Sequence, residues 1–361
     1  MTIPEIIALR LHNQQISSKE FSNAGDLVTW LGAVQAQDYA AAKWALGLRL
    51  SNSTDKEVEH AFNEGTILRT HLMRPTWHFV APQDIRWLLK LTAPRVIAII
   101  NNSGRKLGLD ESVFRRANKL IVKALQGGRY LTRIEIEATL NKAGIVTSDL
   151  HMIHLMMRAE LDGLICSGPR KGKQFTYELL DERAPRSKTL EKEEALAELA
   201  RRYFLSHGPA TVQDFAWWSG LTTKDAGSGC EMVKSKLIHE TIDRQAYWFS
   251  NSIKSVKEKQ AGAYLLPNFD EYTVAYRDRS LLVDAAKVKV MPAPAVLLSN
   301  TIIADGKVAG TWKRILKKDR VEVEINLLHA LSKSKKKDIA IAVKRYGKFL
   351  GLPVTITNAG F

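Results

Sequence analysis

Hydrophobic and polar residues follow one clear order in the segment 101–185, with helical periods first and two short alternating stretches after them. Thr132 is a good helix N-cap, and Gly144 is typical of a helix end. The elements predicted after a first helix are the helix Arg133–Lys142, a helix beginning after Ser148, and the strands Leu164–Ser167 and Gln174–Leu180. Three helices followed by a β-hairpin form a winged helix, in which the hairpin is the wing.

The same order of elements returns on either side of this segment. In 186–252 we predict the helix Ala195–Ser206, a short helix after Thr211, a helix from Thr222 or Thr223 to Lys236, and the strands Leu237–Ile242 and Gln245–Phe249. In 1–100 we predict the helices Asp26–Gln37, Lys43–Arg49 and Lys56–Asn63, with strands through Thr66–Val80. The repetition predicts three winged-helix units in tandem.

Beyond residue 252 the pattern becomes mostly strand-like. The elements predicted here are the strands Ala263–Leu266, Leu281–Val283, Val296–Leu298, Thr301–Ala304, Lys307–Arg314 and Val321–Asn326, and a helix over Lys336–Leu350. The chain is therefore predicted to be an α+β protein with three tandem winged-helix units and a C-terminal β-rich domain. The predicted domains are 1–100, 101–185, 186–252 and 253–361.

The charge of the chain adds a class of partner to this fold. Its 361 residues carry 53 lysines and arginines against 38 acidic residues, a net charge of +15, which favours a polyanion as partner. The excess is concentrated in Arg105–Arg133, with a net +6 (eight basic, two acidic), and in Thr301–Phe361, with a net +8 (thirteen basic, five acidic). No apolar run approaches the ~20 residues of a membrane helix. Three predicted winged helices together with the basic balance favour DNA over a membrane surface.

The sequence gives no sign of a metal site or of export. Cys166 and Cys230 cannot form a disulfide framework and lack the closely spaced partners of a zinc site. The N-terminal segment has no basic n-region and contains Glu5 among its apolar residues, so no signal peptide is predicted. We expect a cytoplasmic, nucleoid-associated monomer without a metal or an organic cofactor.

Two glutamines, Gln35 and Gln37, distinguish this chain from an ordinary DNA-binding regulator. In the predicted helix Asp26–Gln37 the apolar residues recur at helical spacing: Leu27, Trp30, Leu31 and Val34. Both glutamines then lie at the edges of the apolar stripe, where an amide needs partners for its donor and its acceptor. They indicate either a polar pocket or a helix end whose last carbonyls are satisfied by amide side chains.

The segment Leu31–Tyr39, with sequence LGAVQAQDY, resembles the glutamine–apolar–glutamine motif of the tandem winged-helix DNA glycosylases of bacteria. Other stretches that resemble the same family in the same order are Leu68–Val80, Leu265–Tyr272 with Arg277–Ser280, and Gly310–Arg314. The resemblance covers nearly the whole chain. Family members with aspartate at the second motif position form the branch with broader substrates, so Gln37 points to the branch that unhooks interstrand crosslinks.

The resemblance implies hydrolysis of the N-glycosidic bond of alkylated or crosslinked purine nucleotides in double-stranded DNA. An N7-alkylated purine is already a good leaving group, so the enzyme has to stabilise a sugar cation and place a water. Gln37 is expected to hold that water through its carbonyl oxygen, and Gln35 to position sugar or water. Because the motif contains no lysine to attack the sugar, we expect a glycosylase without lyase activity. The alternative is a non-enzymatic winged-helix transcriptional regulator.

Basic residues near these motifs are the candidates for DNA contact. Arg69 and Arg74 belong to the first predicted strand region, although ion pairs with Glu64 or Asp84 would equally explain them. The predicted wing of the second unit contributes three more candidates: Arg170, Lys171 and Lys173.

Another pair of candidates, Lys313 and Arg314, follows Trp312 near the predicted hairpin turn Asp305-Gly306. A tryptophan beside two cations is typical of backbone contact with nearby base stacking, but Trp312 is also a plausible core residue. The residues Asp270–Tyr272 either order these basic side chains or form a structural acidic cluster.

Overall fold

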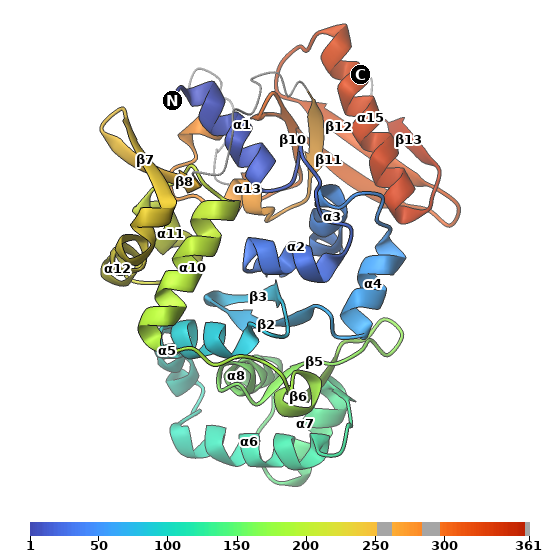
Figure 1. Cartoon of the computed structure of the whole chain (residues 1–361). Coiled ribbons are helices and arrows are strands. Elements are labelled where there is room, and N and C mark those ends of the chain that lie inside the picture. The colour runs from blue at the N-terminus through green and yellow to red at the C-terminus, as the bar shows by residue number, and fades with distance from the viewer. Residues whose placement is uncertain (251–261, 284–296, 358–361) are drawn as a thin grey trace. The chain divides into compact units, whose positions relative to one another are not determined.

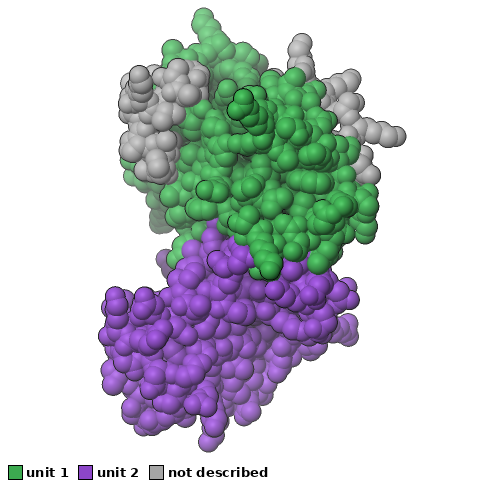
Figure 2. All heavy atoms as spheres, turned by 90° about the vertical axis from the view of Figure 1, so that its left-hand side faces the viewer, with its two compact units in different colours: residues 1–59, 197–218, 223–361 green, residues 60–196, 219–222 purple. Residues whose placement is uncertain are grey.

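A computed structural model of the chain describes residues 1–250, 262–283 and 297–357 (Figure 1). It contains helices and several sheets, which confirms the predicted α+β class. The chain divides into two compact units (Figure 2). Unit 1 comprises Met1–Glu59, Ala197–Trp218 and Thr223–Phe361, and unit 2 comprises His60–Leu196 and Ser219–Thr222.

Unit 2 contains a hairpin, a long helix and a second group of four helices and three strands. Its elements are β2 (Leu68–Leu72), β3 (Arg74–Val80), α5 (Ile85–Lys106), α6 (Glu111–Leu125), β4 (Leu131–Thr132), α7 (Arg133–Lys142), α8 (Asp149–Leu161), β5 (Ile165–Ser167), β6 (Thr176–Leu179) and α9 (Leu180–Arg183). Thr132 caps α7 through a capping box with Glu135, and Ser148 caps α8. The strands β4, β6 and β5 form an antiparallel sheet in that order.

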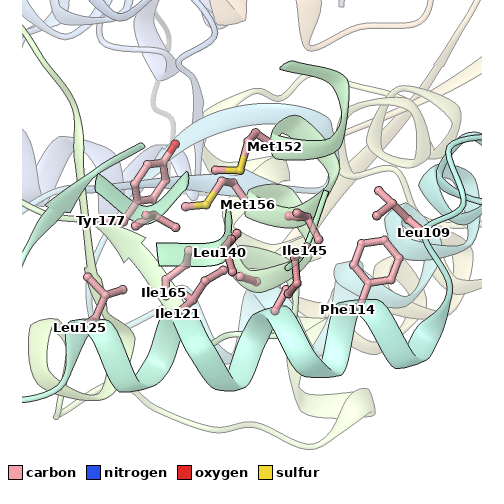
Figure 3. Packing of buried hydrophobic residues seen from close by; sticks show 14 of the residues in the cluster. Leu109, Phe114, Ile121, Leu125, Leu140, Ile145, Met152, Met156, Ile165 and Tyr177 are labelled. Atoms are coloured by element: carbon pink, nitrogen blue, oxygen red, sulfur yellow. The ribbon is translucent and has the colours of Figure 1, made fainter. Parts of the chain in front are cut away.

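One hydrophobic core holds this second group of elements together (Figure 3). Phe114, Ile121 and Leu125 lie along one face of α6, at the helical spacing seen in the sequence, and all three are buried. They pack in the same cluster as Leu140 of α7 and Met156 of α8. The opposite face of α6 is exposed and carries much of the positive charge of Arg105–Arg133.

Unit 1 combines helices from three parts of the chain with a five-stranded sheet. Wholly or in part it contains α1 (Ile3–Asn13), α2 (Ala24–Leu31), β1 (Val34–Gln35), α3 (Tyr39–Arg49), α4 (Asp55–Asn63), α10 (Lys192–Ser206), α11 (Val212–Ser219), α12 (Thr223–Val233), η1 (Lys234–Lys236), β7 (Leu237–Ile242), β8 (Gln245–Ser250), β9 (Ala263–Leu266), α13 (Glu271–Val274), η2 (Ser280–Leu282), β10 (Thr301–Ala304), β11 (Lys307–Leu316), β12 (Val321–Leu327), α15 (Lys333–Leu350) and β13 (Val354–Thr357). The sheet order is β13-β12-β11-β10-β9. Only the β12–β13 pair is parallel among these described strands.

The helix α15 packs against this sheet and against α3 (Figure 1). Trp44 of α3 is almost fully buried and meets the rings of Tyr346 and Phe349 at centroid distances of 5.0 and 5.1 Å. The Trp44 indole also donates to the carbonyl of Leu265 in β9, at 2.7 Å. This aromatic cluster fixes α3, and so the segment just before it, on the sheet.

Several predicted boundaries differ from the structure. The predicted helix Asp26–Gln37 ends at Leu31, because Gly32 takes a positive φ of 79° that stops the helix. The predicted strand Leu281–Val283 is mostly the 3₁₀ turn η2, and the predicted strand 296–298 begins outside the described residues. The long helix α5 was not predicted. Within the described ranges, no helix has the length and apolarity needed to span a membrane.

Candidate active site

The glutamine motif lies in a short extended segment between α2 and α3. The prediction that the motif lies on a helix was wrong. Gln35 ends β1, and Asp38 caps α3 by accepting from the amide of Ala41 at 3.0 Å. In an extended segment, residues two apart point to the same side. Ala36 is fully buried, whereas Gln35 is half-buried and Gln37 is exposed. The alternation therefore turns both amides away from the core, and the alternative of a helix C-terminus closed by them does not hold.

A buried carboxylate anchors this segment through its backbone. The Gln35 amide donates to Oε1 of Glu271, in α13, at 2.8 Å. The other oxygen of Glu271 accepts from Nε1 of Trp218 at 2.9 Å. Since Glu271 is only 1% exposed, these bonds lie in a low-dielectric interior where they are strong. Glu271 thus holds the backbone of the motif at Gln35.

A buried ion pair between Arg49 and Asp270 lies next to this anchor. Arg49, at the end of α3, donates to both oxygens of Asp270 at 2.8 and 2.7 Å, and it also donates to Gln14 at 3.1 Å. Gln14 in turn donates to the hydroxyl of Tyr276 at 2.8 Å. Asp270–Tyr272 is therefore the structural acidic cluster, one of the two alternatives left open by the sequence, and its partner is Arg49.

His207 closes the network on the far side of Glu271. Its Nε2 lies 3.6 Å from a Glu271 oxygen, and its ring stacks on Tyr203 at a centroid distance of 5.0 Å. Burial lowers the pKa of His207, although Glu271 acts in the opposite direction. The histidine is therefore neutral near pH 7 and contributes packing and polarity rather than charge.

Of the two basic candidates in β11, Arg314 belongs to the surroundings of the motif. It is half-buried and donates to the Tyr346 hydroxyl at 3.2 Å. Burial lowers the pKa of Arg314, but Tyr346 and the nearby carboxylates of Asp38 and Asp55 outweigh burial and raise it. Arg314 is thus a permanent positive charge close to Asp38, the residue that follows Gln37.

The neighbours of Arg314 in β11 have different environments. Lys313 is exposed and lies opposite Glu324 of β12. Trp312 is 3% exposed, donates to the Leu266 carbonyl at 2.8 Å and meets the ring of Tyr346 edge-on. Trp312 is therefore a core residue, and base stacking on it is excluded in this conformation.

In unit 2, Arg69 is buried between aromatic rings. Its guanidinium lies 4.3 Å from the ring centroid of Trp77 and 4.6 Å from that of Phe175. With 7% exposure, the side chain offers little surface to a phosphate. Arg74 is half-buried at the first residue of β3.

The predicted wing forms between β5 and β6, and its three cations are not equivalent. The Arg170 guanidinium packs 4.2 Å from the Phe175 centroid and donates to the carbonyls of Gln174 and Lys173, so it stabilises the turn. Lys171 is 59% exposed and pairs with Glu135 at 3.0 Å. Lys173 is exposed. The two lysines are the cations of this turn that are available to a partner.

We expect Lys171→Ala combined with Lys173→Ala to weaken binding of duplex DNA about equally for all sequences. The log–log salt dependence should fall by about 0.9 per lost phosphate contact, while the melting temperature stays nearly unchanged because both side chains are exposed. Fluorescence anisotropy over a salt series measures both effects. The control is Lys90→Ala with Lys188→Ala, two exposed lysines elsewhere in unit 2. Affinity equal to that of the wild type would reduce this hairpin to scaffold.

Within unit 1, the structure brings Gln35, Gln37 and Arg314 to one region of the molecule. The sequence shows Asp270 and Glu271 as two adjacent acidic residues in a mostly apolar stretch. It does not indicate their partners, which are Arg49 and the backbone of Gln35. In the part of the chain that the structure describes, no group of three or more histidine, cysteine or acidic side chains is arranged to hold a metal ion.

Most of the chain, including the segment with the glutamine motif, matches the model of a known protein family. A family model described as DNA glycosylase AlkZ-like matches residues 28–349, which is most of the chain. The chain therefore belongs to the AlkZ-like family of DNA glycosylases, as its sequence motifs predicted.

The chain is also similar to a curated protein and to a solved structure, both from Streptomyces sahachiroi. The chain is 23% identical over 336 residues to the interstrand DNA cross-link repair glycosylase of Streptomyces sahachiroi, a match covering 86% of this chain and 87% of the relative. The solved structure of the S. sahachiroi DNA glycosylase AlkZ is similar with a TM-score of 0.78 at 19% identity, covering 99% of this chain and 100% of that chain. At this identity the likeness in structure establishes the fold.

Proposed function

We propose that this chain is a monofunctional DNA glycosylase that releases alkylated or crosslinked purines, with Gln35 and Gln37 as its catalytic residues. The observation that carries the proposal is the anchored extended segment, which turns both amides to the same side while Glu271 holds its backbone. The name of the S. sahachiroi relative supports the crosslink as one substrate.

The amide pair suits the chemistry of a charged leaving group. When the glycosidic bond breaks, its electron pair goes to the purine and neutralises the positive charge that alkylation placed on it. Water adds to C1′ of the sugar and loses a proton to solvent. A neutral amide is too weak a base for an unactivated nucleotide, but its oxygen can orient the water and stabilise the sugar cation.

The surroundings of the motif support hydrolysis without a covalent amine intermediate. Lys43 is the lysine nearest to the motif in sequence. Its ammonium pairs with Asp55 at 2.8 Å and with Glu59 at 2.7 Å. A lysine nitrogen held in two ion pairs is not free to attack the sugar. Gln35 and Gln37 would therefore act on water, and strand cleavage would require a separate alkaline step.

The direct test is incubation of the full chain with a duplex that carries one N7-alkylated guanine. We expect release of the modified base and an abasic site that breaks only after alkali. A parallel crosslinked duplex, analysed on a denaturing gel, tests unhooking. If neither substrate loses a base while the protein footprints one DNA sequence, the chain acts as a winged-helix regulator instead.

A further inference from the structure

A basic pocket lies in unit 1 on the side of α3 that faces α15. Its volume is about 480 Å³, which is within the range of small-ligand sites. The floor is apolar and includes Trp44 and Phe349. The walls are the loop 50–54 that follows α3 and one face of α15.

Four cations line this pocket: Lys19, Lys344, Arg345 and Lys348. No carboxylate is among its lining residues in the described chain, and the ammonium groups of Lys19 and Lys344 have no hydrogen bond or ion pair with any described residue. The α15 residues recur three and four apart, so they form one stripe along the helix. Like charges gathered in one pocket repel one another, as the effect of Arg345 on the pKa of Lys19 shows.

Arg345 is held in place in a way that leaves part of its guanidinium available. Its Nη2 donates to the carbonyls of Gly47 at 3.2 Å and Leu50 at 3.4 Å, and also to that of Leu48, at the end of α3. Its Nε and Nη1 bond to none of the described residues. The fixed guanidinium therefore presents donors to the pocket with little loss of side-chain entropy on binding.

The lowered pKa values of two cations in the pocket also favour an anion as ligand. Burial, and then the charge of Arg345, lower the pKa of Lys19 to about 8. Burial lowers the pKa of Arg345 to about 10, and Arg49 adds to the effect. Lys19 is also held at a φ of 62°, a conformation that residues other than glycine rarely adopt. An anion in the pocket would relieve the repulsion among these cations.

We propose that this pocket binds a phosphate group through Lys19, Lys344, Arg345 and Lys348. Asn52, whose Oδ1 accepts from the Lys348 ammonium at 3.5 Å, adds a neutral amide donor at the wall. The volume accepts a phosphate together with its attached sugar. The phosphate belongs either to the DNA backbone, an assignment that rests on the proposed function, or to a small phosphorylated molecule.

The test compares Lys344→Gln/Lys348→Gln with the wild type, using pyrophosphate and undamaged duplex DNA as probes. We expect pyrophosphate to raise the melting temperature of the wild type and to leave that of the double variant unchanged. If the source is DNA, the log–log salt slope for duplex binding should also fall by about one to two. A lost pyrophosphate effect with an unchanged slope assigns the pocket to a small molecule.

The matched control is Lys307→Gln/Lys333→Gln, which removes the same charge from exposed positions of unit 1 outside the pocket. Base release by the wild-type protein is measured in parallel: release without a pyrophosphate or slope effect contradicts the pocket alone, and no release contradicts the proposed chemistry alone. Lys19→Met should raise the melting temperature without ligand and abolish the pyrophosphate effect. Wild-type protein that responds to neither probe, or a double variant that behaves like the control, overturns the proposal.

Discussion

Gln37→Ala should lower the rate of base release from an N7-alkylated duplex by about 10²–10³, the loss typical of one preorganised polar group. The affinity for DNA should remain, because the change removes no charge and Gln37 is exposed. Single-turnover kinetics with saturating enzyme separates the chemical step from binding. The measured quantity is the amount of alkali-labile strand breaks against time.

Gln35→Ala is the natural companion, because it removes the amide side chain and keeps the backbone N–H that Glu271 accepts. It should also slow release, and the double variant should lose less than the product of the two single losses if the amides act as one unit. Gln37→Asp is expected to retain activity and to extend it to simpler monoadducts, because a carboxylate stabilises the sugar cation and activates water. Wild-type rates in both single alanine variants and in the double variant would show that the active site lies elsewhere.

Asp270→Ala should destabilise unit 1 by about 3–5 kcal/mol, because it leaves the Arg49 guanidinium buried without its carboxylate. Both side chains are almost fully buried, so solvent does not screen the loss. Urea unfolding followed by tryptophan fluorescence measures the effect. Six of the eight tryptophans belong to unit 1, so the signal reports mainly on that unit.

The comparison for this prediction is Asp319→Ala, which breaks the exposed pair between Asp319 and Arg320. Because water screens that pair, the expected change in free energy of unfolding is within about 0.5 kcal/mol. Equal stability of the two variants would mean that the Arg49–Asp270 pair contributes nothing beyond packing.

Elements with local signals could be predicted from the sequence. The helix α7 and the strand β7 have the predicted bounds, because a capping threonine and a two-residue turn at Asp243-Arg244 mark them. The helix α5 was missed because Pro94 lies inside it, and proline normally argues against a helix interior. Tertiary packing of its buried face overrides that local preference.

The sequence indicated Gln35 and Gln37 as candidate residues, but it did not predict the extended backbone of the segment that carries them. Val34 continues the helical spacing of the preceding apolar residues, so periodicity extended the predicted helix through Gln37. The positive φ of Gly32 instead ends the helix at Leu31. The anchor could not be predicted, because Gln35 and Glu271 are 236 residues apart in the chain. Only the fold brings together groups so distant in sequence.

The hydrogen bond from the Gln35 backbone N–H to Glu271 has a consequence for substitutions in the motif. Because the anchor contacts the peptide backbone, the side chains at positions 35 and 37 are exchangeable without loss of their placement. Ala36, fully buried between them, keeps the register of the segment. Under the proposed function, a change of lesion specificity requires only a new side chain at position 35 or 37, with the backbone bond to Glu271 unchanged.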